Sequence, residues 1–186
     1  MANLKQKYYE KRANVLVKNL HSRHFEACYC ADKAEALKKA LEWIPAGSSD
    51  GWSGAMSAQQ IGLLDTARTG DSRALDRERG ATPEERKAIM KQCLGADVFI
   101  TGANALSLDG QMVNIDGNGN RVSSTLYGHQ KVYFLVGVNK VAPDFEAALW
   151  RAPNVAAPQR AQSMGGRTPR AAQAGPGYDC QSPERH

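Results

Sequence analysis

The 186-residue sequence lacks long hydrophobic runs and begins with a charged segment. A membrane-spanning helix needs about 18 consecutive apolar residues, and no run in this sequence approaches that length. The first residues, MANLKQKYYEKRANVLV, are amphipathic and have no apolar core of the kind found in secretory signals. We therefore expect a cytoplasmic protein that has no membrane partner.

Cysteine is scarce and unevenly spread, at positions Cys28, Cys30, Cys93 and Cys180. The loop between Cys28 and Cys30 is too short for a disulfide to be expected, so reduced thiols are the simplest interpretation. His21 and His24 precede this pair with metal-like spacing. However, a helix is predicted to end between the two pairs, which favours a solvated helix end and small buried thiols. We predict no metal site.

Aromatic residues are also few, at 7% of the chain, and the net charge of +5 is modest. Part of that charge lies beyond Trp150, in Arg151, Arg160, Arg167, Arg170 and Arg185. These arginines are not interleaved with aromatic rings, so we expect no nucleic-acid partner. Because Pro, Gly, Ala, Gln and Arg dominate there, we predict an α/β domain over 1–150 and an extended or partly disordered tail over 151–186.

Periodicity in the first half of the chain predicts both helices and strands. Apolar residues recur at helical spacing over Leu4–Leu20, which indicates an amphipathic helix. Alternation over Phe25–Tyr29 predicts a strand. Capping boxes at Asp32 and at Thr82 predict the starts of two further helices.

The stretch from Val98 to Val138 defines the predicted fold class. Lys131–Val138 reads KVYFLVGV, an almost uniformly apolar run typical of a strand buried on both faces. Val98–Ile100 is a second such run. Met112–Ile115, a turn at Asp116–Asn120 and a returning strand at Arg121–Leu126 are predicted to form a hairpin. We expect a three-layer α/β fold with a mostly parallel sheet flanked by helices.

A Gly/Ser-rich loop over residues 47–57 is the first candidate ligand contact. Ser57 and Gln60 are predicted to cap the helix that follows it. Free main-chain N–H groups at such a helix start favour anions. The alternative is a tight turn before a capped helix, without a ligand. The candidate residues are Ser53, Gly54, Ala55 and Ser57.

Polar residues after the apolar runs are the second candidate contact. They are Gly102, Asn104, Asn139 and Lys140. Ligands of open α/β sheets bind at the carboxyl ends of strands, so these residues are expected to share one small-molecule site. Lys140 would supply a charge for a phosphate or carboxylate, although it could equally be a solvated surface lysine. Asp116 is a weak candidate for a general base, and the alternative is that it caps a turn.

The segment TGANALSLDGQMVNIDGNGNRVSSTLYGHQKV, followed by VGVNKV, resembles the signature of the LUD-domain family. These lactate-utilisation proteins are related to the C subunit of the bacterial lactate-utilisation system. The resemblance runs from about Tyr8 to Val141, with weaker similarity to Arg185. It implies the fold shared with ribose-phosphate isomerases, glucosamine-phosphate deaminases and CoA transferases. A family motif resembling Gly-Gly-Ser-Met-Thr corresponds to Ser53–Ser57, where Ser53 and Ala55 depart from it.

The resemblance implies a subunit or accessory of L-lactate oxidation to pyruvate, acting with iron–sulfur partner proteins. The alternative is a stand-alone enzyme or binder of a phosphorylated sugar or CoA ester. Either function implies an anionic small molecule as ligand, and a homo-oligomer stays open. Arg170 stands where the family tail has a cysteine, and Cys180 alone remains of the later ones. Because a cluster needs about four ligands, we expect no iron–sulfur cofactor on this chain.

Overall fold

The computed structural model describes residues 4–163 and has an α/β fold. The described residues form two compact units, each assembled from segments distant in sequence. Unit 1 comprises 4–29, 103–118 and 137–163, and unit 2 comprises 30–102 and 119–136. Among these residues, no helix is both long and apolar enough to cross a membrane.

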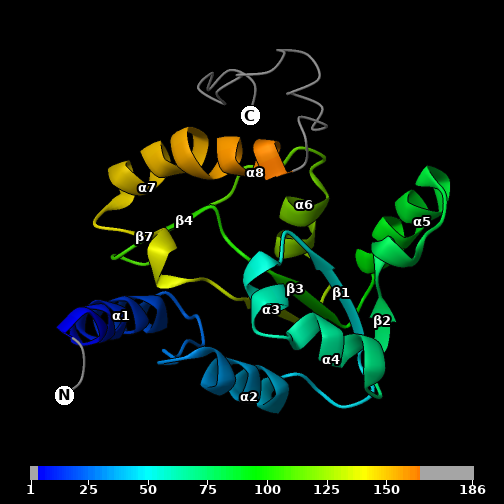
Figure 1. Ribbon diagram of the computed structural model, residues 1–186, viewed down its shortest axis with the longest axis horizontal. Helices are drawn as coiled ribbons and strands as arrows, with labels where there is room; N and C mark the ends of the chain where they lie inside the picture. Colours follow the sequence, from blue (N-terminus) through cyan, green and yellow to red (C-terminus); the bar gives the residue numbers. More distant parts are fainter. Residues whose placement is uncertain (1–3, 164–186) are drawn as a thin grey trace. The chain divides into compact units, whose positions relative to one another are not determined.

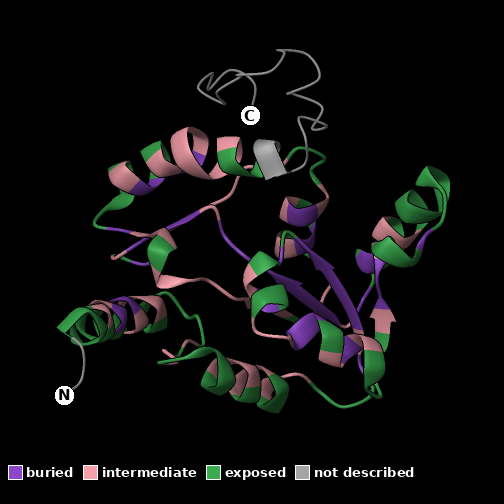
Figure 2. Cartoon of the chain, in the orientation of Figure 1, coloured by how far each residue is buried: buried purple, intermediate pink, exposed green. Residues whose placement is uncertain are grey.

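Unit 2 is built on a fully parallel sheet with the strand order β2-β1-β3-β6. The strands are β1 (Ser49–Ser53), β2 (Arg73–Leu75), β3 (Val98–Thr101) and β6 (Lys131–Phe134). The two central strands, β1 and β3, are the most deeply buried (Figure 2). The predicted parallel sheet is therefore confirmed, although the apolar run after Lys131 forms a shorter strand than its length indicated.

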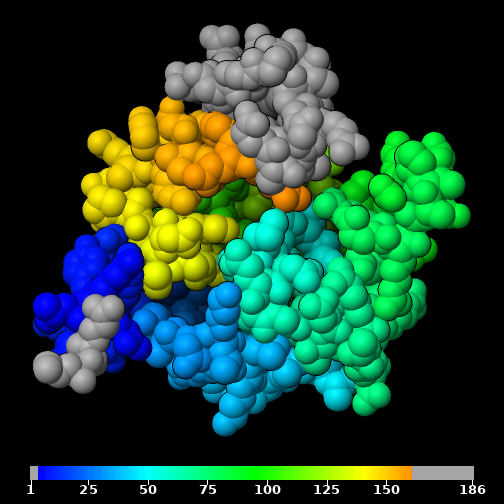
Figure 3. All heavy atoms as spheres, in the orientation of Figure 1, coloured from blue at the N-terminus to red at the C-terminus, as the bar shows by residue number. Residues whose placement is uncertain are grey.

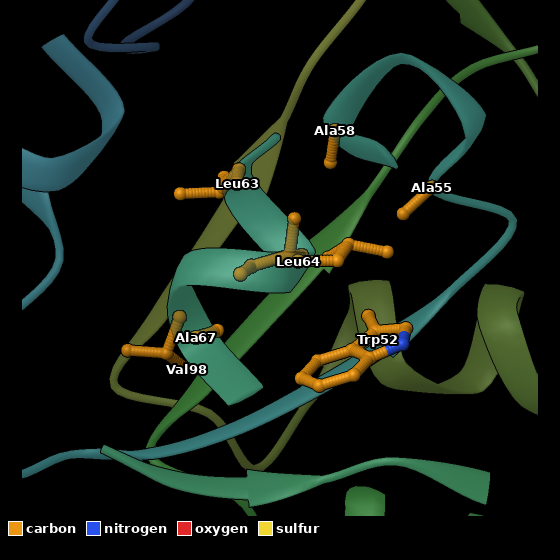
Figure 4. Packing of buried hydrophobic residues seen from close by; sticks show 8 residues of the cluster. Trp52, Ala55, Ala58, Leu63, Leu64, Ala67 and Val98 are labelled. Carbon is orange, nitrogen blue, oxygen red and sulfur yellow. The ribbon is translucent and has the colours of Figure 1, made fainter. Parts of the chain in front are cut away.

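One face of this sheet is covered by α2 (Lys33–Trp43), α3 (Met56–Gln60) and α4 (Leu63–Thr69). Figure 1 shows α3 and α4 in front of β1 and β3. Val98 and Ile100 join Leu63 and Leu64 in one core cluster on this face, and Figure 4 shows Val98, Leu63 and Leu64 in that cluster. Leu63 is fully buried, so its replacement by Ala should cost about 2–5 kcal/mol.

The opposite face is covered by α5 (Pro83–Cys93). Phe99, which alternates with Val98 and Ile100, packs there with Cys93 and Leu75. Helices on both faces of the parallel sheet give the three-layer arrangement that was predicted. A Cβ at Gly51 would lie 3.0 Å from the Cβ of Cys93, so glycine allows α5 to approach β1 closely.

Unit 1 contains the long helix α1 (Leu4–Ser22), a three-stranded sheet of order β5-β4-β7 and a C-terminal helical segment. The strands are β4 (Ala105–Ser107), β5 (Met112–Val113) and β7 (Val141–Ala142). Helix α7 (Phe145–Arg151), the π-helical turn η3 (Ala152–Ala156) and α8 (Ala157–Ser163) follow one another. Small residues of this segment, Ala148 and Ala152, pack on Ala105 and Ala142.

Two predicted helix starts are confirmed. The side chain of Asp32 accepts the Glu35 N–H at 2.9 Å at the start of α2. Thr82 and Glu85 form a reciprocal capping box at the start of α5, where Pro83 follows the cap.

Four local predictions are wrong. Residues 25–29 are described but form neither helix nor strand. The segment predicted as a loop contains the central strand β1. Within the described chain, α3 begins after Ala55 without a side-chain cap, so the Ser57–Gln60 box is absent. The predicted returning strand is a helix, α6 (Asn120–Leu126), and Gly119 precedes it with φ +76°.

The predicted tail begins differently from the expectation. From Ala152 to Ser163 the chain is helical rather than extended. Residues 164–186 lie outside the described part of the chain, and so does Cys180.

Candidate functional site

The carboxyl ends of β1 and β3 carry a polar cluster within unit 2. The register pairs Ser53 with Thr101, so both strands end side by side. The Thr101 hydroxyl donates to the Ser53 carbonyl at 2.8 Å and fixes the two ends together. Ligands of parallel α/β sheets bind at this kind of edge.

Helix α6 brings two further side chains to this cluster. The Asn120 amide donates to the Ser53 hydroxyl at 3.1 Å, and Nη1 of Arg121 donates to the Gly102 carbonyl at 3.4 Å. Arg121 is only 9% exposed. A buried guanidinium lies next to the end of a parallel sheet, where a ligand carboxylate could meet it.

Gly54 makes room for this arginine. Its φ is +62°, a left-handed conformation that favours glycine, and a Cβ there would lie 2.8 Å from Cδ of Arg121. The glycine therefore serves two purposes, since it permits the turn after β1 and leaves space for the Arg121 side chain.

Ser124 shows why this segment is helical. Arg121 and Ser124 are both buried, and residues three apart lie on one face of a helix but on opposite faces of a strand. The Ser124 hydroxyl donates to the Asn120 carbonyl at 2.9 Å, which satisfies it inside the helix. Sequence reasoning missed Asn120 and Arg121 because it placed Asn120 in a hairpin turn and Arg121 in the returning strand, and the β-branched Val122 and Thr125 are compatible with a strand.

The predicted site residues divide between the two units. Ser53, Gly54, Ala55, Ser57 and Gly102 belong to unit 2, whereas Asn104, Asn139 and Lys140 belong to unit 1. Ser53, Gly54 and Gly102 meet in the cluster just described. The anion contact inferred from a capped helix start loses its basis, because the predicted cap is absent among the described residues and α3 is a short helix of five residues. That all eight residues share one site stays a prediction.

Asn104 has structural contacts in unit 1. Its Oδ1 accepts the Ile115 N–H at 3.1 Å, and its carbonyl accepts a hydrogen bond from Arg151. Burial lowers the pKa of the Arg151 guanidinium from its ordinary value. Next to Val113, Asn114 holds a buried Oδ1 that has no hydrogen-bond partner within residues 4–163. Such an acceptor is a feature that ligands satisfy in binding sites.

Lys140 lies at the amino end of a strand, not at the carboxyl end where it was predicted. Strand β6 ends at Phe134, and Val138–Lys140 form a 3-10 turn directly before β7. Because β4 and β7 are parallel and Leu106 is in register with Val141, Asn104 and Lys140 come to the same edge of the small sheet. They are therefore neighbours within unit 1.

Asp116 accepts the Asn118 N–H at 3.3 Å. This contact is the one expected if Asp116 caps a turn. A catalytic role for Asp116 stays a prediction.

The described cysteines and histidines do not come together as a metal site. Cys28 is exposed, Cys30 is half-buried and Cys93 is buried. No three His, Cys, Asp or Glu side chains among residues 4–163 come together as metal ligands. Residues 4–163 therefore do not by themselves supply the roughly four ligands that an iron–sulfur cluster needs, and the absence of such a cofactor stays a prediction.

Comparison with known families decides the identity of the domain. Residues 13–185 match the family model of the LUD domain. The chain belongs to the LUD-domain family. Neither the curated proteins nor the solved structures contain a match. LUD domains are associated with lactate-utilisation proteins.

Proposed function

We propose that this LUD-domain chain serves the oxidation of L-lactate to pyruvate as a subunit or accessory that binds the organic acid. The observation that carries the proposal is the buried Arg121 between Gly54 and Gly102, at the carboxyl edge of a parallel sheet. Membership of the LUD-domain family supports it independently.

The chemistry of the cluster suits a 2-hydroxy or 2-oxo acid. A guanidinium carries five N–H donors in a planar fork, so it can hold a carboxylate and a main-chain oxygen together. The Ser53 hydroxyl accepts from Asn120, which leaves its own O–H to donate to the oxygen on the second carbon of the acid.

The oxidation releases two electrons and two protons. The side chains of this cluster bind and orient the acid, the two electrons pass to iron–sulfur partner proteins and the two protons are released to solvent. A stand-alone enzyme or binder of a phosphorylated sugar or CoA ester is the competing function.

Ligand titration of the full chain tests the proposal. L-lactate, pyruvate, a sugar phosphate and a CoA ester would each be followed by calorimetry and by thermal shift. Saturation at about 100 times Kd stabilises by roughly 2.7 kcal/mol, which is readily detected. Arg121→Gln should lower the affinity for lactate or pyruvate at least tenfold, and Arg121→Lys should lower it less.

Arg73→Gln is the matched control, because Arg73 is an exposed arginine of β2. It should leave the affinity unchanged. Preferential binding of the sugar phosphate or CoA ester would support the competing function. If the Arg121 and Arg73 variants lost affinity for lactate or pyruvate to the same extent, the organic acid would bind elsewhere.

A further inference from the structure

Helix α1 carries a stripe of exposed residues on the side opposite to its buried face. Leu4, Tyr8 and Val15 are 84%, 53% and 52% exposed, and Lys11 and Lys18 are also exposed. The positions 4, 8, 11, 15 and 18 are separated by four and three residues in turn. This is the spacing of a seam along which a second helix packs.

The inner face of α1 packs on the rest of unit 1, so the stripe on its other side faces away from that unit. Ala13 and Leu16 are buried. Asn19 donates to the Leu108 carbonyl at 2.7 Å, and Arg12 donates to the Val141 carbonyl at 3.2 Å. The atoms of α1 form part of the visible surface in the space-filling view (Figure 3).

The positive charges of the stripe favour a partner that carries carboxylates. Lys11 and Lys18 form no hydrogen bond or ion pair with residues 4–163. Each follows an exposed apolar residue, Tyr8 or Val15, along the stripe. A partner helix with apolar side chains opposite Tyr8 and Val15 and carboxylates opposite the two lysines would match this pattern.

We propose that this stripe is a docking surface for an acidic amphipathic helix of a partner protein. The inference goes beyond the binding of an organic acid and does not depend on it. Its basis is the juxtaposition of exposed apolar residues and exposed lysines at heptad spacing on a helix whose other face is anchored.

A second copy of the chain fits the stripe poorly. Glu10 is the one acidic residue of α1. Pairing two α1 helices would therefore bring lysines together without carboxylates to neutralise them, in either orientation.

A membrane surface and a nucleic acid also fit poorly. Helices that lie in a membrane interface keep an apolar face separate from the charged face, whereas Lys11 lies within the apolar stripe. Base stacking uses the faces of a ring, and Arg12 lies over one face of Tyr8 at 5.5 Å and donates to its hydroxyl at 2.9 Å, although the residue as a whole is 53% exposed.

The test uses the full chain and a synthetic three-heptad helical peptide with leucines at the seam and glutamates placed to meet Lys11 and Lys18. A second peptide carries lysines in place of the glutamates. The chain should bind the glutamate peptide at least tenfold more tightly. Lys11→Glu/Lys18→Glu should reverse this preference, and Val15→Ser should weaken binding severalfold.

Lys87→Glu/Lys91→Glu is the control for net charge, because both lysines are exposed on α5. It should leave peptide binding within a factor of two or so of the original. Circular dichroism and melting temperature verify that each variant is folded. Absent binding of the glutamate peptide, or equal losses in the α1 and α5 variants, would overturn the proposal. So would tighter, α1-dependent binding to phosphatidylserine vesicles or to duplex RNA.

Discussion

Asn120 donates its side-chain amide to the Ser53 hydroxyl at 3.1 Å, although the two residues are 67 positions apart. The bond ties the first turn of α6 to the last residue of β1. It therefore orients the hydroxyl that is proposed to meet the ligand.

Asn120→Ala should weaken binding of lactate or pyruvate severalfold, because the Ser53 hydroxyl loses the donor that orients it. The stability cost should be about 0.5–1.5 kcal/mol, which is typical of one hydrogen bond. Calorimetry and urea unfolding measure the two effects. Asn118→Ala is the control, since Asn118 is exposed and uses its main-chain N–H in the turn. Unchanged affinity in Asn120→Ala would remove Ser53 from the proposed site.

Gly54→Ala should displace Arg121. The new Cβ would lie 2.8 Å from Cδ of Arg121, and the residue would keep a φ of +62°. The conformational strain alone costs about 1–2 kcal/mol. Gly62→Ala has the same kind of strain, with φ +83°, but nothing lies within 4 Å of its Cβ. Thermal unfolding should therefore show that both variants are destabilised, whereas titration should show that only Gly54→Ala loses organic-acid binding. Retained binding in Gly54→Ala would show that the position of Arg121 is not critical.

Gly51→Ala should destabilise unit 2 without touching the candidate site. The added Cβ meets Cβ of Cys93 at 3.0 Å and its Cα at 3.2 Å, so α5 must move away from β1. Overpacking of this kind costs about 1–3 kcal/mol. At Gly95 a Cβ would meet its nearest neighbour at 3.8 Å, so Gly95→Ala should be close to neutral. The urea midpoints of unfolding of the two variants should be compared. Equal midpoints would show that the close approach of α5 to Gly51 does not limit the side chain at this position.

The sequence predicted the parallel sheet because Val98–Ile100 and the run after Lys131 are apolar without interruption. It did not predict β1, whose sequence SDGWS has no apolar pattern. Strand β1 lies inside the sheet because it pairs with β2 on one side and with β3 on the other. Gly51 also lets α5 pack closely against it. Such tertiary context is not visible in local propensity.

The candidate site was predicted in part for the same reason. Gly102 follows the apolar run Val98–Ile100 and is recognisable as a strand end, whereas Ser53 and Gly54 were predicted only as part of a Gly/Ser-rich loop before a helix. Arg121 was missed, because its role depends on α6 turning its side chain toward the end of β3. In the sequence Arg121 and Ser124 are both polar, so hydrophobic periodicity does not mark them as the buried face of a helix.

Asp97 should make stability depend on pH at the amino edge of the sheet. Its carboxylate accepts from the Ser49 hydroxyl at 2.6 Å, from the Ser49 N–H at 3.0 Å and from Gln130 at 2.7 Å. These bonds, those from Ser49 first, hold the pKa of Asp97 below its ordinary value.

A lowered folded pKa means that the stabilisation is present above the unfolded pKa of about 3.9 and is lost as the pH falls through the folded pKa. Asp97→Asn should therefore be less stable than the original chain at pH 7, and the difference should shrink below about pH 4. Unfolding free energies across this range measure the effect. Asp71→Asn, at an exposed aspartate, should show no such difference. A difference in unfolding free energy between the two proteins that stays constant with pH would show that ionisation of Asp97 is not its cause.

Truncation after Trp150 should destabilise unit 1, although the composition of the following residues suggests a dispensable tail. Arg151 donates to the Asn104 carbonyl, and Ala152 is fully buried against the small sheet. A hydrogen bond from a charged donor contributes about 1.5–3 kcal/mol. Since 1 kcal/mol shifts the melting temperature of a chain of this size by about 2–4 °C, a protein ending at Trp150 should melt several degrees below one ending at Ser163. Arg151→Ala in the longer protein should reproduce part of that shift. Identical melting temperatures for the two truncated proteins would show that residues 151–163 add nothing to the stability of unit 1, despite the contacts of Arg151 and Ala152.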